Sequence, residues 1–160
     1  MEQERLLNSD AFAGFIDETL RQQAIAFAEK LIDSEIRVKR HQLYSIPSAI
    51  QAGGLKEIQE LVKKQAEKDN RNTEFWKAIQ AHIAQNTPDG RTGLFHIVRI
   101  FLSENGFLPS EDAVQNPSEK KQLQRKNKEI VNQVIDQVLQ VYFEHFGCHY
   151  FFRIQKGKTS

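Results

Sequence analysis

The sequence contains few of the residues that cross-link or interrupt a chain. Among its 160 residues it has one cysteine, Cys148, and four prolines. A single cysteine excludes an intramolecular disulfide, which fits a reducing compartment. No apolar run reaches the roughly 18 residues that a membrane-spanning helix needs. The first ten residues, MEQERLLNSD, are too acidic and polar for a secretory signal. We therefore expect a cytoplasmic protein.

Motifs that indicate catalysis are also missing. The chain has no G-x-S-x-G, no phosphate-binding loop and no dinucleotide fingerprint. His145, Cys148 and His149 lie close together, but structural zinc sites use four ligands in paired spacings, and the neighbours here are aromatic. Packing is therefore the better interpretation, with Cys148 as a buried structural thiol and His96 as a hydrogen-bonded core histidine. We expect no enzymatic activity, no metal site and no cofactor.

The residues that are present are typical of one globular helical domain. Hydrophobic residues make up 39% and charged residues 27% of the chain, and this length can bury a real core. Apolar residues recur at helical spacing over most of the sequence. The pattern predicts an all-α fold, a single-domain helical bundle of five or six helices with a long C-terminal helix. We expect the helical domain to cover residues 1–154 and a flexible tail to cover 155–160.

The clearest amphipathic helix is the first. Ser9 or Asp10 is expected to cap its N-terminus, and the helix is predicted to run to about residue 37. Its apolar residues follow the three-and-four spacing of one helical face. They are Phe12, Phe15, Ile16, Leu20, Ala24, Phe27, Ala28, Leu31 and Ile32.

The next helical stretch, residues 38–52, contains a proline and ends at two glycines. Pro47 lacks a backbone donor and crowds the preceding turn, which predicts a break or kink near Ser45–Ile46. Gly53–Gly54 is expected to end the stretch, because glycine suits the left-handed turn after a helix. A third helix is then predicted from Leu55 to Lys68.

Three further helices are expected in the second half of the chain, with loops at 86–93 and 107–117 between them: residues 74–85, 94–105 and 118–146. Thr73 and Thr92 are the expected caps of the first two. The run LFHIVRIFL in the second is also short and β-branched enough for a buried strand. The last helix has a charged first half, which should project into solvent or lie on a partner, and an apolar second half. The closing CHYFFRI is predicted as a short strand or a hydrophobic clasp.

Basic residues gather in three places although the formal net charge is only +1. Lys/Arg outnumber Asp/Glu by seven to three in residues 36–68 and by eight to four in residues 119–160. Such faces bind phosphate backbones without reading sequence. A solvated charged surface is the alternative for each cluster. The candidate nucleic-acid-binding residues are Arg37, Lys39 and Arg40; Lys63 and Lys64; and Lys121, Arg125 and Lys128.

Residues 20–83 resemble a known family, the small all-helical subunit of type III CRISPR effector complexes of the Cmr-type branch. RQQAIAFAEKL (21–31) is similar to the first amphipathic helix of that family. YSIPSAIQAGGLKEIQELV (44–62) is similar to its stretch in which a proline-containing helix leads to a Gly-Leu turn and another helix. FWKAIQAHI (75–83) stands where a short aromatic helix follows. The resemblance covers about two fifths of the chain.

The resemblance implies a non-catalytic protein of antiviral defence, with no cofactor. Such a subunit stacks in copies along a ribonucleoprotein filament and helps to hold the duplex of guide RNA and target. Its partners would be the other subunits of that complex, and RNA or single-stranded nucleic acid on the basic helix faces, with no membrane. Two other hypotheses remain open: a helical protein-interaction adaptor with no nucleic-acid role, and an enzyme with an unrecognised site.

Overall fold

The computed structural model describes residues 5–6, 9–85 and 93–159, and its elements are helices. The described residues contain no strand, so the all-α prediction is confirmed, and LFHIVRIFL is helical. Within the described ranges five helices have ten residues or more, which agrees with the predicted bundle of five or six. In this part of the chain no helix is long and apolar enough to cross a membrane. The elements are α2 (Asp10–Gly14), the π-helical η1 (Phe15–Leu20), α3 (Arg21–Asp33), α4 (Arg40–Ala66), α5 (Thr73–His82), α6 (Leu94–Glu104), the 3-10 turn η2 (Glu111–Ala113) and α7 (Pro117–Thr159).

The first rod, α2–η1–α3, begins as predicted and ends earlier. The Ser9 side chain accepts a hydrogen bond from the Phe12 N–H at 3.0 Å, which caps the first turn. The five-residue step between the buried Phe15 and Leu20 matches the i→i+5 bonding of the π-helical turn. The predicted end near residue 37 is wrong, because the chain turns left-handed at Glu35 with φ 58°. The Ile36 N–H then bonds back to the Leu31 carbonyl at 2.9 Å.

The predicted break at Pro47 is also wrong. The backbone of α4 stays helical through Ser45 and Ile46, and the kink lies instead at Gly53 and Gly54. An interior proline costs about 3 kcal/mol. Leu43, Ile46 and Ile50, on the turns around Pro47, are all buried in the core. Burial of such side chains contributes about 1.5–3 kcal/mol each, enough to keep this turn helical.

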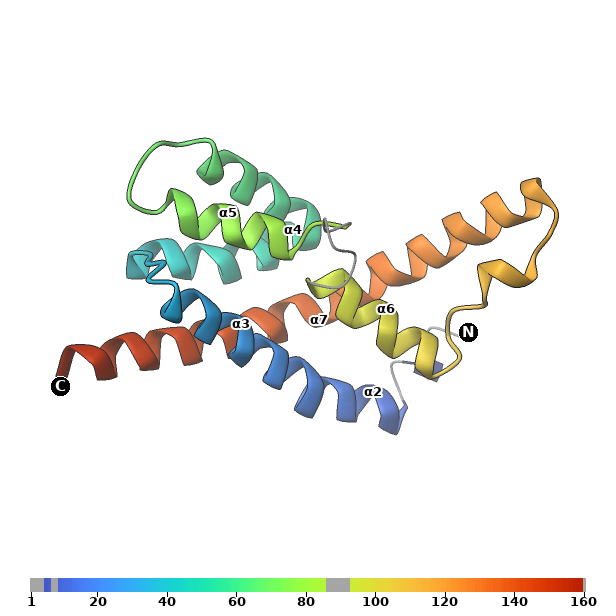
Figure 1. The fold of residues 1–160 in the computed structure, drawn as a ribbon, viewed down its shortest axis with the longest axis horizontal. Helices are drawn as coiled ribbons and strands as arrows, with labels where there is room; N and C mark the ends of the chain where they lie inside the picture. The colour runs from blue at the N-terminus through green and yellow to red at the C-terminus, as the bar shows by residue number, and fades with distance from the viewer. Residues whose placement is uncertain (1–4, 7–8, 86–92, 160) are drawn as a thin grey trace.

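The kink is fixed by a contact with α7. Gly54 has φ 66° and ψ −142°, a backbone conformation that residues other than glycine rarely adopt. Directly after it, the Leu55 N–H donates to the Asp136 carboxylate on α7 at 2.9 Å. Asp136 thus caps the second half of α4 from another helix. The two halves of α4 are thereby folded back on each other, and Figure 1 shows them on the upper left.

Replacing Gly54 by alanine is expected to destabilise the protein by about 1–3 kcal/mol, the cost of a forced left-handed residue. The new Cβ would also lie 2.7 Å from the Asp136 Oδ1, which would disturb the cap. Gly14→Ala is the matched control, because Gly14 is helical and its Cβ would meet nothing within 4 Å. That control should keep or raise stability by up to about 1 kcal/mol. Equal urea midpoints for both variants would contradict this account of the kink.

The helices α5 and α6 both bury large apolar side chains. In α5 the aromatic and aliphatic residues Phe75, Trp76 and Ile79 are fully buried. Thr73 is the first residue of α5 rather than its cap, and its hydroxyl instead accepts from the Asn70 N–H at 2.9 Å. The predicted loop at 86–93 and the Thr92 cap lie outside the described residues, apart from Gly93 at the start of α6.

The last helix is longer than predicted. α7 has 43 residues, which is about 65 Å at 1.5 Å per residue. It continues past residue 146 through CHYFFRI, so the expected strand or clasp there is wrong. The helix also includes residues 155–159 of the predicted tail, whose flexibility stays a prediction. In Figure 1, α7 runs along the whole molecule from its orange to its red end.

The apolar half of α7 is the centre of the core. It packs against α3 and α4, and also contacts α6. A continuous stripe of its side chains is at most 3% exposed, and all of them except Tyr150 lie in the predicted apolar half of the helix. These residues are Val131, Val134, Ile135, Val138, Leu139, Tyr142, Phe143, Phe146 and Tyr150. The surfaces around this stripe carry the candidate binding residues.

Candidate nucleic-acid interface

All eight candidate basic residues are exposed, but the fold divides them between two ends of the molecule. Arg37, Lys39 and Arg40 lie at the junction of α3 and α4, and Lys63 and Lys64 lie in the last turn of α4. Figure 1 shows both segments toward the end where α7 finishes. The third cluster, on residues 121–128, lies toward the other end, where α7 begins. We call these the junction end and the projecting end.

The α3–α4 junction is held in place by three hydrogen bonds. The Arg37 guanidinium donates to the Ile32 carbonyl at 3.2 Å, at the C-terminal end of α3. The Tyr150 hydroxyl on α7 donates to the Ile36 carbonyl at 2.8 Å, and burial raises the pKa of Tyr150. The Lys39 N–H donates to the Asn72 side chain at 3.2 Å. The last bond ties the junction to the turn that follows Lys63 and Lys64, so the fold brings two predicted clusters to one end.

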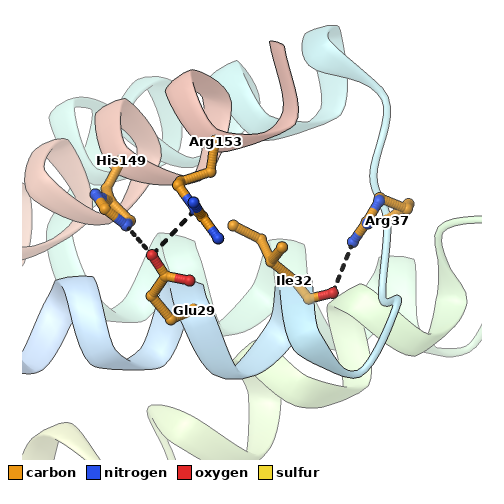
Figure 2. A network of polar contacts seen from close by, with 5 residues as sticks. All are labelled: Glu29, Ile32, Arg37, His149 and Arg153. Atoms are coloured by element: carbon orange, nitrogen blue, oxygen red, sulfur yellow. Dashed lines mark hydrogen bonds and ion pairs between the residues drawn. The ribbon is translucent and has the colours of Figure 1, made fainter. Parts of the chain in front are cut away.

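A polar network beside the junction connects α3 with α7, as Figure 2 shows. The His149 Nε2 donates to the Glu29 carboxylate at 2.7 Å, and the Arg153 Nε lies 3.2 Å from the same oxygen. The hydrogen bond from His149 lowers the pKa of the Glu29 carboxyl, and the charge of Arg153 adds to the effect. Among the described residues, no group of three or more His, Cys, Asp or Glu side chains is arranged to hold a metal ion. His149 thus serves as a contact between helices.

Arg40 joins the junction to an aromatic surface that the sequence pattern did not reveal. Its guanidinium carbon lies 4.4 Å from the centre of the Phe151 ring on α7 and 5.6 Å from the Tyr44 ring. Tyr44 is 51% exposed and Phe151 is half-buried. Cations over aromatic faces attract each other through the ring quadrupole. The sequence shows that Phe151 is apolar and lies near the end of α7. Its pairing with Arg40 spans more than a hundred residues and is visible only in the folded structure.

The prediction that Cys148 is buried is wrong. Its side chain is exposed, because Cys148 lies outside the buried stripe of α7. It lines a groove between α4 and α7. The aromatic neighbours that suggested burial divide between two sides of the helix, with Phe146 and Tyr150 buried and Phe152 62% exposed.

The projecting end matches its prediction in part. Lys121, Arg125 and Lys128 are exposed. This half of α7 is partly covered, however, because residues 107–116, which precede it, pack back on the helix. Asn127 is buried, and its amide donates to the Pro109 carbonyl at 3.2 Å and to Glu111 at 3.4 Å. The basic residues therefore lie on a helix that the 107–116 segment helps to order.

The sequence did not reveal the pairing of the partly buried His82 with the buried Tyr142. His82 stacks on Phe27 with ring centres 3.7 Å apart and is hydrogen-bonded to the Tyr142 hydroxyl. Burial lowers the pKa of His82 to about 3, with a further contribution from Lys30, and burial raises the pKa of Tyr142. Neither group is therefore poised for acid–base work near neutral pH. His82 borders a cavity of about 630 Å³, and His96, expected in the core, is partly exposed on its lining.

The fold and these surfaces define an all-helical protein with exposed basic residues at both ends of a long helix. Comparisons of the chain with protein families, with characterised proteins and with solved structures found no match.

Proposed function

We propose that this chain is a non-catalytic helical subunit of a nucleic-acid-processing complex. It resembles the small subunit of type III CRISPR effectors, and in that role it would help to hold the duplex of guide and target. The supporting observation is the exposure of all eight candidate Lys and Arg residues at the junction and projecting ends. The resemblance supplies the cytoplasmic ribonucleoprotein context, with the other subunits of the complex as partners.

The separation of the two ends favours a polymeric ligand. Between Lys121 and Arg153, α7 rises about 48 Å at 1.5 Å per residue. A nucleic-acid strand covers that distance with about 14 nucleotides at 3.4 Å each. A small anion reaches only one end. An extended chain of phosphates reaches both and releases counterions at each.

A protein-interaction adaptor is the second candidate, because the groove between α4 and α7 exposes apolar surface. Binding of labelled RNA at low and moderate salt separates the two hypotheses. The nucleic-acid role predicts that the logarithm of the RNA affinity falls linearly with the logarithm of the salt concentration. An adaptor with no nucleic-acid role predicts no RNA binding even at low salt.

A further inference from the structure

The groove between α4 and α7 has the dimensions of a small ligand site. Its volume is about 310 Å³, within the range of ligand pockets. Its floor is formed by buried apolar side chains, and its rim carries the exposed Tyr44 and Cys148 and the half-buried Phe151. The lining residues on the floor are Leu43, Ile46, Phe143 and Phe146.

Gly147 keeps this groove open. It is a lining residue in the interior of α7, where glycine costs about 1 kcal/mol relative to alanine. The φ angle of Gly147 is not positive, and a Cβ placed on this residue would meet nothing within 4 Å. Neither the backbone nor the packing of the chain therefore requires glycine here. The space above Gly147 is available to a bound group.

The side chains around the groove are better suited to bind a nucleobase than a phosphate. The Arg40 guanidinium lies over Phe151 and Tyr44, and the exposed Arg37 and Lys39 lie on the same junction. Glu144, the one carboxylate among the described residues that line the groove, would repel a phosphate inside it. Aromatic rings that stack on bases beside cations that contact phosphates are the combination that binds single-stranded nucleic acid.

We propose that this groove takes an unpaired base of single-stranded RNA, stacked against the exposed Tyr44 beside the Arg40–Phe151 pair, while Arg37 and Lys39 contact the adjoining phosphates. The proposal rests on the nucleic-acid role above and names the ligand of the junction end. A base held in a duplex is stacked between its neighbours and does not enter the groove. The groove thus selects a single strand, whereas the exposed basic residues of the junction end can also contact the phosphates of a duplex.

Cys148 is a built-in reporter, because it is the only cysteine of the chain and lines the groove. Single-stranded RNA is expected to slow the reaction of Cys148 with a thiol reagent, and an RNA duplex of equal length is not. Gly147→Leu fills the groove and should weaken single-strand binding about 5- to 150-fold, the value of one stacked base. The slope of log affinity against log salt should stay unchanged, because no phosphate contact is lost. Gly14→Leu, on an exposed helical glycine away from the groove, is the matched control and should bind as the parent does.

Thermal melting of both leucine variants confirms that they are folded. RNA binding that is equal in the parent and Gly147→Leu, with Cys148 unprotected, overturns the base site and leaves the proposed function standing. Protection of Cys148 by an amphipathic peptide but not by RNA assigns the groove to a protein partner and also overturns it. Absence of binding to any RNA, single- or double-stranded, refutes the proposed function itself.

Discussion

Acidification from pH 6.5 is expected to destabilise the folded protein through His82 by about 1.4 kcal/mol per pH unit, reaching about 4 kcal/mol near pH 3. The pKa of His82 falls from 6.5 in the unfolded chain to about 3 in the fold. A basic group whose pKa is lowered by folding binds its proton more strongly in the unfolded chain than in the folded one. Protons therefore favour unfolding across this window, and above pH 6.5 the effect disappears.

The structure offers a variant that isolates this contribution. His82→Gln removes the titrating ring and keeps an acceptor for the Tyr142 hydroxyl, which otherwise loses its partner. Chemical denaturation at several pH values should give a flatter pH dependence for the variant than for the parent. Carboxyl groups such as Glu29 also lose stabilisation in acid, but they do so equally in both proteins. Parallel curves would show that folding does not change the pKa of His82.

Truncation of Trp76 to alanine is expected to cost about 3–5 kcal/mol, the usual range for a buried aromatic residue. Trp76 is 0% exposed and meets Phe75 edge-on with ring centres 5.3 Å apart. Its indole N–H also donates to the Gln42 side chain on α4 at 3.2 Å. The residue thus stabilises the packing of α5 on α4, and a loss of this size removes much of the stability of a single domain.

Two further variants separate packing from hydrogen bonding at this site. Trp76→Phe keeps an aromatic ring in the core and should cost clearly less than Trp76→Ala. Gln42→Ala removes only the acceptor and should cost about 1–3 kcal/mol if the indole N–H is left unpaired. Urea midpoints of the three proteins provide the comparison. A Gln42→Ala cost as large as that of Trp76→Ala would contradict the dominance of packing.

Most of the fold could be predicted because helical periodicity is a local signal. The spacing of Val131, Val134 and Val138 marks a buried face whatever the rest of the chain does, and these residues are buried. The errors fall where distant residues decide. Pro47 stays helical because its neighbours are buried, and α3 ends without glycine because Glu35 turns left-handed. Neither outcome has a signature in the local sequence.

The candidate site was predictable as a set of residues but not as an arrangement. Lys and Arg at exposed helical positions are readily recognised, and all eight are exposed. Their division between two ends depends on how α4 folds back and how far α7 extends. The contact of Arg40 with Phe151 and the hydrogen bond between His82 and Tyr142 join residues far apart in sequence. Such pairs become visible only in three dimensions.

The central claim is that the exposed basic surfaces bind phosphates, and charge reversal at the projecting end tests it most directly. Lys121, Arg125 and Lys128 would be replaced together by glutamate, and RNA affinity measured across a salt series for parent and variant. We predict that the variant binds RNA more weakly. The slope of log affinity against log salt should become flatter by a little under one for each phosphate contact that is lost. Thermal stability should be nearly unchanged, because exposed charges contribute little. A folded triple variant that binds RNA as tightly as the parent, with the same salt slope, would contradict the account.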